Sequence, residues 1–281
     1  MLEAIVSLGG IGLSAAILLG LASKKFAVEV DPRELELLDA LPGANCGACG
    51  FPGCAGFARA LAEGKVDPAA CAPGGQATIE RLASILGVSA SLREPEVAVV
   101  ICQGDQVKAK DKYRYLGVDD CNAAQILAGG PKLCPGGCLG LGSCARACPF
   151  GAIEITEQGL AVISREKCTG CTKCVAACPR QVIRMVPASA TIHVLCNSHD
   201  KGAIVRKYCQ VGCIACQICK KAAPEAYVIE DFLARVVYDH HGQAATAVEK
   251  CPTHCIRDFI SGYPEGSTFA PSIVPSSDEA A

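Results

Sequence analysis

The stretch that decides the fold runs from residue 134 to residue 179 and contains two similar cysteine loops. Residues 134–149 read CPGGCLGLGSCARACP, and residues 168–179 read CTGCTKCVAACP. The second loop has the spacing C-x2-C-x2-C-x3-C-P. The first loop has Leu141 in place of one cysteine and carries an additional cysteine at position 134. Two loops of one pattern, close together in the chain, predict a single unit built around their cysteines.

Iron–sulfur chemistry explains this pattern. In such loops of bacterial ferredoxins three thiolates bind one 4Fe-4S cube, and the cysteine before proline binds the other cube of the pair. One predicted ligand set is therefore Cys148, Cys168, Cys171 and Cys174. The partner set contains Cys138, Cys144 and Cys178, with Leu141 where a fourth ligand is expected. Cys134 is the candidate substitute, and the sequence leaves open whether it serves as one.

Composition favours metal sites over other uses of cysteine. The chain has 21 cysteines in 281 residues, which indicates either a disulfide scaffold or metal sites. Disulfide scaffolds are typically short and secreted, so this long chain favours thiolate–metal bonds in a reducing, cytoplasmic compartment. Zinc ribbons use two separated C-x2-C pairs rather than three cysteines in one loop. The net charge of −2, without a long basic run, argues against a nucleic-acid partner.

An uncharged segment lies near the amino terminus, where residues 4–23 read AIVSLGGIGLSAAILLGLAS. At 1.5 Å per residue it extends about 30 Å, the thickness of a hydrocarbon core, which predicts a transmembrane helix. Lys24 and Lys25 follow the segment, which disfavours a cleaved signal peptide and places later residues on the cytoplasmic side. We therefore expect a single-pass protein of the inner (cytoplasmic) membrane, anchored in the lipid bilayer with its amino terminus outside. A buried core helix is the alternative.

A separate cysteine unit follows this segment. Its cysteines are Cys46, Cys49, Cys54 and Cys71. Glycines between them allow a loop to wrap closely around a cluster, and residues 31–41 and 76–86 have helical patterns. Asp31, followed by proline, is typical of a helix start. These features predict a small domain with one 4Fe-4S cluster, and a zinc knuckle is the alternative.

The pattern of the central region returns later in the chain. Cys196 corresponds to Cys102, and the pair Cys209 and Cys213 repeats the spacing of the pair that begins at Cys134. The chain therefore has an internal repeat of about 75 to 80 residues, with one ferredoxin lobe in each copy. Paired short strands are expected at residues 152–156 with 160–164, and at residues 226–230 with 234–238.

The second copy has lost cysteines in an ordered way. The replaced positions are Ala223, His241, Ala244 and Ala247, and under crossed ligation they all belong to one cube. The retained set is Cys213, Cys216, Cys219 and Cys251. We therefore expect this lobe to hold one cluster instead of two. His241 is interpreted as a solvated side chain rather than as a replacement ligand.

Five cysteines stand outside these sets: Cys102, Cys121, Cys196, Cys209 and Cys255. A lone cysteine is more often a small buried hydrophobe than a ligand. The inventory leaves open a further cluster built from Cys102, Cys121, Cys196 and Cys209, with Cys134 as another candidate. Cys255 is interpreted as a packing residue. The expected cofactors are therefore about four 4Fe-4S clusters, or about five if the leftover cysteines bind one.

The order of these units resembles the RnfB family, the iron–sulfur subunits of Rnf complexes, in its longer form with two ferredoxin lobes. The resemblance rests on the apolar segment, on PGANCGACGFPGCAGFA (residues 42–58) and on the two central cysteine loops, and it covers residues 1–260. It implies a subunit of a membrane-bound ferredoxin:NAD oxidoreductase, with soluble ferredoxin as electron donor and other subunits of a membrane complex as partners. The family's cluster cysteines correspond to Cys46, Cys49, Cys54, Cys71, Cys138, Cys144, Cys148, Cys168, Cys171, Cys174, Cys178, Cys213, Cys216, Cys219 and Cys251.

The predicted architecture is α+β with five parts. They are a transmembrane anchor (1–25), a 4Fe-4S domain (26–90), two ferredoxin-like lobes (91–190 and 191–260, the second degenerate) and a disordered tail (261–281). The predicted role is one-electron relay within a translocase that moves Na⁺ or H⁺. No catalytic site of its own is expected, since no G-x-G-x-x-G motif follows a strand. The alternatives are a relay subunit of another membrane reductase, such as one that reduces a redox-sensing regulator, and a zinc-held binding module.

Overall fold

A computed structural model describes residues 2–25, 31–89 and 94–259, with side chains in the first helix described from Gly9 onward. The helices are α1 (Leu2–Lys25), α2 (Pro32–Ala40), α3 (Cys54–Ala62), α4 (Gly75–Leu86), α5 (Cys121–Ile126), α6 (Ser143–Ala147), α7 (Lys173–Ala177), α8 (Gly202–Tyr208) and α9 (Ile218–Ala222), with 3-10 helices η1 (Pro68–Ala70), η2 (Ala72–Gly74) and η3 (Tyr238–Ala247). The strands are β1 (Glu96–Val100), β2 (Ile153–Ile155), β3 (Ala161–Ile163), β4 (Ile183–Pro187), β5 (Ile192–Val194), β6 (Tyr227–Glu230), β7 (Leu233–Val236) and β8 (Ile256–Asp258). The predicted disordered tail, residues 261–281, lies outside the described residues.

The amino-terminal helix corrects one prediction. α1 (Leu2–Lys25) covers the uncharged segment. Among the described residues, no helix is both long and apolar enough to cross a membrane. The predicted transmembrane helix, and the single-pass topology that depended on it, are therefore wrong for this structure.

Three helices build the small domain, residues 31–89, around one apolar core. α2 begins as predicted, because Asp31 caps it by accepting the N–H of Arg33 at 2.9 Å and Pro32 occupies its first position. The core side chains Leu37, Phe57, Leu61 and Leu82 are at most 1% exposed. Fully burying a side chain of this kind contributes about 1.5–3 kcal/mol. The same cluster includes Cys54, so packing of the helices fixes where the cysteine loop meets α3.

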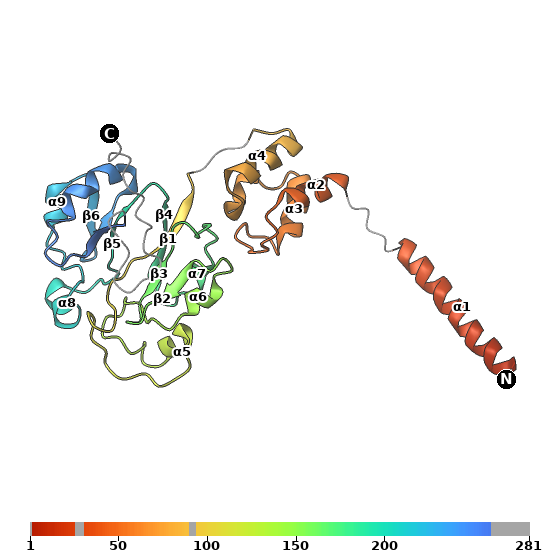
Figure 1. Ribbon diagram of the computed structural model, residues 1–281, viewed down its shortest axis with the longest axis horizontal. Coiled ribbons are helices and arrows are strands. Elements are labelled where there is room, and N and C mark those ends of the chain that lie inside the picture. Colours follow the sequence, from red (N-terminus) through yellow and green to blue (C-terminus); the bar gives the residue numbers. More distant parts are fainter. Residues whose placement is uncertain (1, 26–30, 90–93, 260–281) are drawn as a thin grey trace, which may run out of the picture.

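Residues 94–190 form lobe one and residues 191–259 form lobe two (Figure 1). Both lobes follow one strand order. In lobe one the antiparallel pair β1–β4 encloses the hairpin β2–β3 along the chain. In lobe two the pair β5–β8 encloses the hairpin β6–β7 in the same way. The two predicted hairpins are therefore confirmed. Short helices follow the cysteine loops in both lobes, and the 3-10 helix η3 stands in lobe two where lobe one has α7.

Backbone contacts join the two lobes. Segments 108–110 and 208–210 form a short antiparallel bridge with N···O distances of 2.8 and 3.0 Å. Gly136 of lobe one lies so close to lobe two that a Cβ on it would stand 2.1 Å from the carbonyl oxygen of Asn197. Only a residue without a side chain fits there. The lobes are therefore packed backbone against backbone next to the cysteine loop of lobe one.

Candidate iron–sulfur sites

In the small domain the predicted cysteines line one cavity of about 320 Å³: Cys46, Cys49, Cys54 and Cys71. The loop folds around this cavity because the N–H of Cys54 donates to Asn45 Oδ1 at 2.8 Å. Gly53, with φ of 93°, leaves room for that amide, since a Cβ there would stand 2.8 Å from the same oxygen. Burial raises the pKa of the Cys71 thiol, and the three neighbouring thiols raise it further. The four thiols therefore share one small, mostly apolar space.

In lobe one the cysteines predicted for one cluster also lie together: Cys148, Cys168, Cys171 and Cys174. Burial raises the pKa of Cys174 to about 12, and interactions with the other three thiols contribute. The N–H of Ala98, on β1, donates to Cys168 Sγ at 3.3 Å. Gly170, with φ of 71°, allows the loop to approach the same strand, because a Cβ there would stand 2.7 Å from the carbonyl oxygen of Glu96. β1 thus supports this loop.

The second site of lobe one differs from the simplest interpretation of the sequence. A cavity of about 320 Å³ is lined by Cys121, Cys138, Cys144 and Cys178. Cys134 is not among its lining residues. Burial raises the pKa of Cys144 to about 11, and the thiols of Cys121 and Cys178 add to this effect. The structure therefore places Cys121 with the three predicted ligands that lacked a fourth because of Leu141.

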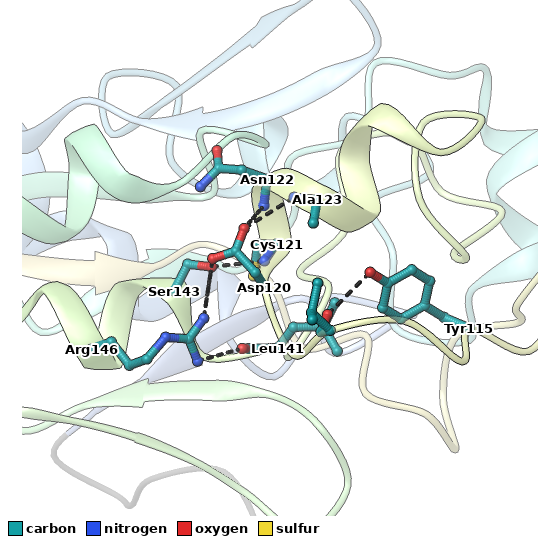
Figure 2. A network of polar contacts seen from close by, with 9 residues as sticks. Tyr115, Asp120, Cys121, Asn122, Ala123, Leu141, Ser143 and Arg146 are labelled. Carbon is teal, nitrogen blue, oxygen red and sulfur yellow. Dashed lines mark hydrogen bonds and ion pairs between the residues drawn. The ribbon is translucent and has the colours of Figure 1, made fainter.

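A polar network holds Cys121 in this position (Figure 2). Asp120 caps α5 by accepting two backbone N–H groups of its first turn at 2.9 and 3.0 Å. Ser143, the first residue of α6, donates its hydroxyl to Asp120 at 2.8 Å and accepts the N–H of Cys121 at 2.7 Å. The N–H of Ala123 and the Ser143 hydroxyl lower the pKa of Asp120 to about 2, and Arg146 at 3.1 Å contributes. The network fastens α5 to α6, and each helix carries one cysteine of the set.

In lobe two the retained cysteines line a cavity of about 330 Å³: Cys213, Cys216, Cys219 and Cys251. Cys255 lines it too, with its Sγ 3.5 Å from the Sγ of Cys251. Hydrogen bonding to Cys255 lowers the pKa of Cys251 to about 4 and that of Cys213 to about 6, while it raises the pKa of Cys255 itself. Cys255, which the sequence suggests is a packing residue, therefore touches the candidate ligands.

The positions at which lobe two lacks cysteine are filled by a packed core. Ala223, Ala244 and Ala247 are 3%, 0% and 0% exposed, and they pack in one cluster with Tyr227. The Tyr227 hydroxyl donates to the carbonyl oxygen of Ala244 at 2.9 Å. His241 is half-buried, and its Nδ1 lies 2.6 Å from the carbonyl oxygen of Tyr238. These side chains occupy the space that a second cube in this lobe would need.

The last set of cysteines lines a cavity of about 350 Å³ between the lobes: Cys102, Cys134, Cys196 and Cys209. In all four thiol-lined cavities, no carboxylate or imidazole is among the described lining side chains. Thiolates are the soft ligands that iron–sulfur clusters use, so these donor sets fit a 4Fe-4S cube. A site for a single metal ion is a separate question, and within the described ranges no three His, Cys, Asp or Glu side chains form one.

Three stretches of the chain match models of iron–sulfur families. Residues 41–73 match a putative Fe-S cluster family. Residues 131–179 match a 4Fe-4S dicluster domain, and residues 210–258 match a 4Fe-4S single cluster domain of Ferredoxin I. The dicluster match falls on lobe one with its two thiol sets, and the single-cluster match falls on lobe two with its one retained set. The protein therefore carries multiple 4Fe-4S clusters.

Relatives of known name extend over most of the chain. The RnfB protein of the Na⁺-translocating ferredoxin:NAD⁺ oxidoreductase complex of Acetobacterium woodii is 43% identical over 89% of this chain and 75% of its own length. Its counterpart in the proton-translocating ferredoxin:NAD⁺ oxidoreductase complex of Clostridium ljungdahlii is 44% identical over 90% of both chains. The counterpart in the ion-translocating oxidoreductase complex of Methanosarcina acetivorans is 38% identical over 91% of this chain and 97% of its own. The chain therefore belongs to the RnfB family of ion-translocating ferredoxin:NAD⁺ oxidoreductase complexes, as an iron–sulfur electron-transfer subunit.

Proposed function

We propose that this chain accepts electrons from reduced ferredoxin and relays them, one at a time, to the other subunits of its complex. The observation that carries the proposal is the presence of several all-thiol sites in neighbouring positions of one chain. The names of the relatives, which include ferredoxin, NAD⁺ and ion translocation, support it. The units that hold the sites are residues 26–90, 91–190 and 191–260.

Four ligand sets belong to this proposal. They are Cys46, Cys49, Cys54 and Cys71 in the small domain; Cys148, Cys168, Cys171 and Cys174, and Cys121, Cys138, Cys144 and Cys178, in lobe one; and Cys213, Cys216, Cys219 and Cys251 in lobe two. Each set would hold one cube through four thiolate ligands. The lobe-one sets follow the crossed arrangement, in which Cys148 and Cys178 each bind the cube of the other loop.

Electrostatic effects between thiols support an order of the sites. Burial is the main cause that raises the pKa of Cys171, and the thiols of Cys148 and Cys46 add to it, so a small-domain thiol is close enough to act electrostatically on the first lobe-one set. Burial is the largest cause that raises the pKa of Cys174, followed by the thiols of Cys168 and Cys171. The thiol of Cys144 raises it further, so the two lobe-one sites lie close together. In the proposed relay, clusters held by these sets would pass electrons between the small domain and both sites of lobe one, in either direction.

The residues of the chain keep the clusters bound and shielded. A bound 4Fe-4S cluster supplies a centre that gains and loses a single electron. Burial raises the pKa of Cys144 and of Cys219 to about 11, so each thiol stays protonated at neutral pH until an iron cation takes the place of its proton. Backbone N–H groups such as that of Ala98 donate to ligand sulfurs and stabilise the added electron. This chain thus makes and breaks no covalent bond of a substrate.

The place of action follows from the proposed complex. Ion translocation requires a membrane, so the chain works as part of an assembly at the cytoplasmic membrane. Its iron–sulfur units face the cytoplasm, where ferredoxin and NAD⁺ are dissolved. Other subunits carry out hydride transfer to NAD⁺ and the movement of Na⁺ or H⁺.

Reduction by ferredoxin tests the donor. Anaerobically purified chain, oxidised beforehand, is mixed with reduced ferredoxin, and the loss of visible absorbance is followed. We expect ferredoxin to bleach the chain to nearly the extent that dithionite does. A chain that dithionite bleaches and reduced ferredoxin does not would keep its clusters but lose the proposed donor. A colourless protein with zinc in place of iron would refute the relay itself.

Iron content tests the assignment of Cys121. Cys121→Ala removes one of the four ligands of its cube, so we expect the loss of about four irons and four sulfides per chain relative to the parent. Leu141→Ala is the matched control, because it changes the position where the loop pattern expects a cysteine without touching a thiol, and it should keep the parent content. Equal iron in Cys121→Ala and in the parent would contradict the assignment.

A further inference from the structure

One thiol-lined cavity lies outside the matched families. Its cysteines are Cys102, Cys134, Cys196 and Cys209, and of these only Cys134 falls within a stretch that matches an iron–sulfur model. Two of the four come from each lobe. The four cysteines do not form a spacing motif in the sequence, because each comes from a different stretch of the chain. Their association exists only where the two lobes meet.

The repeat explains why the four thiols converge. Cys102 follows β1 and Cys196 follows β5, which are equivalent strands of the two lobes. Cys134 and Cys209 each lie four residues before the first ligand of a cysteine loop. The interlobe backbone bridge runs through Cys209 itself. Each lobe therefore contributes an equivalent pair, and the docking of the lobes turns two pairs into a set of four.

We propose that these four thiols bind a fifth 4Fe-4S cluster between the lobes, which carries electrons from lobe one to lobe two. The cavity has a volume of about 350 Å³, compared with about 320–330 Å³ for the three thiol-lined cavities within the matched families. Volume alone is not decisive, since another cavity of about 330 Å³ is lined by a single cysteine. The set of four thiols is what the interlobe cavity shares with the cluster sites.

Hydrogen bonds to sulfur support this interpretation. Cys102 Sγ accepts the N–H groups of Gly104 and Cys138, each at 3.4 Å. The candidate ligands Cys168 and Cys213 accept backbone N–H groups in the same way, at 3.3 and 3.5 Å. Backbone N–H donors stabilise a sulfur that carries negative charge, as a cluster ligand does. A thiol that served only as a small hydrophobe would not need two of them.

Positive charge also gathers beside the cavity. Arg180 donates through Nη1 to the carbonyl oxygens of Cys134 and Pro135 at 2.6 and 2.5 Å. The ammonium of Lys132, with the residue only 2% exposed, donates to the carbonyl oxygen of Asp105 at 2.9 Å. Four thiolates around a cube leave a net negative centre, and buried cations are stable close to such a centre.

The position of the cavity gives the cluster its role, which rests on the proposed relay. On one side the N–H of Cys138, a lobe-one ligand, donates to Cys102. On the other side the N–H of Cys213, a lobe-two ligand, donates to Cys196. A cluster held by Cys102, Cys134, Cys196 and Cys209 would take one electron from the lobe-one side and give it up to the lobe-two side, and would so return to its oxidised state. This path joins two lobes that otherwise share no candidate ligand set.

The iron and acid-labile sulfide content of the anaerobically purified full chain tests the proposal. Five cubes give about twenty irons and twenty sulfides per chain, whereas four cubes give about sixteen of each. We expect the higher value. About sixteen irons in a chain that reduced ferredoxin still bleaches would overturn the interlobe cluster and leave the proposed relay standing. Absence of iron would overturn both.

Paired substitutions identify the ligands. Cys102→Ala and Cys196→Ala come from different lobes, yet each should remove about four irons, and the double variant should also remove only about four. The matched control pairs Cys102→Ala with Cys121→Ala, which belong to different cubes and should together remove about eight. Single variants that retain the full iron content, or a Cys102/Cys196 double variant that loses about eight, would overturn the proposal. The content of the unsubstituted chain decides the question even if a variant fails to fold.

Discussion

Gly136→Ala should separate the lobes at the interlobe cavity. The new Cβ would stand 2.1 Å from the carbonyl oxygen of Asn197, whereas an ordinary contact of this kind is about 3.3 Å. The two backbones must therefore move apart by roughly 1.2 Å. Both groups belong to the main chain, so no change of side-chain rotamer relieves the clash. Overpacking of this kind costs about 1–3 kcal/mol.

A loss of about 2 kcal/mol in the free energy of unfolding lowers the unfolding midpoint of the two-lobe unit, residues 94–259, by roughly 4–8 °C. The midpoint is measured anaerobically by circular dichroism, with iron content determined on the same samples. Gly137→Ala is the matched control, because its Cβ would meet Cys134 Cβ at an ordinary distance of 3.4 Å, and a change within about 0.5 kcal/mol is expected. If the two variants unfolded at the same temperature, the close approach of the lobes at Gly136 would be refuted.

Acid should destabilise lobe two through His193, which is fully buried. Burial is the main cause that lowers the pKa of its ring from 6.5 to about 4. The unfolded chain binds more protons between these values, so stability is complete above about pH 6.5, falls by about 1 kcal/mol at pH 6 and by about 3 kcal/mol at pH 4. His193→Gln should remove this part of the pH dependence of the unfolding midpoint; a parent curve as flat as that of the variant would contradict the argument. Arg180→Met leaves the carbonyl oxygen of Cys134 without a donor at 2.6 Å, so the free energy of unfolding measured in denaturant should fall by roughly 3 kcal/mol, and an unchanged value would show that the bond contributes nothing. Cys255→Ala should keep the iron of lobe two but remove a thiol donor 3.5 Å from Cys251, so the potential of that cluster in a redox titration should become more negative; loss of about four irons would instead make Cys255 a ligand.

Much of the candidate site could be predicted from spacing. The small-domain set spans residues 46–71, and the loop at 168–174 carries three of its four cysteines within seven residues. Ligands that are close in the chain are brought together by the loop itself, whatever the rest of the fold does. The hairpins were predictable for a similar reason, since alternating strands joined by a tight turn need only local contacts.

Hydropathy was a weaker guide. It led to a transmembrane helix at residues 4–23, while the described residues of the structure contain no helix that meets the length and apolarity of a membrane span. The ordered loss of cysteines in lobe two was more informative. Ala223, Ala244 and Ala247 pack with Tyr227 in one buried core, so these positions are filled by packed side chains.

The sequence by itself predicted which loops carry candidate ligands, because the cysteines of one loop are only a few residues apart. Only the tertiary structure shows that Cys121, rather than Cys134, lines the cavity of the second lobe-one set, since the network of Asp120 and Ser143 fastens α5 to α6. It likewise decided that Cys134 meets Cys209 and their two partners between the lobes. Spacing along a chain specifies neighbours within a loop, whereas contacts between loops depend on how strands pair and lobes dock, and a single sequence does not display that pairing.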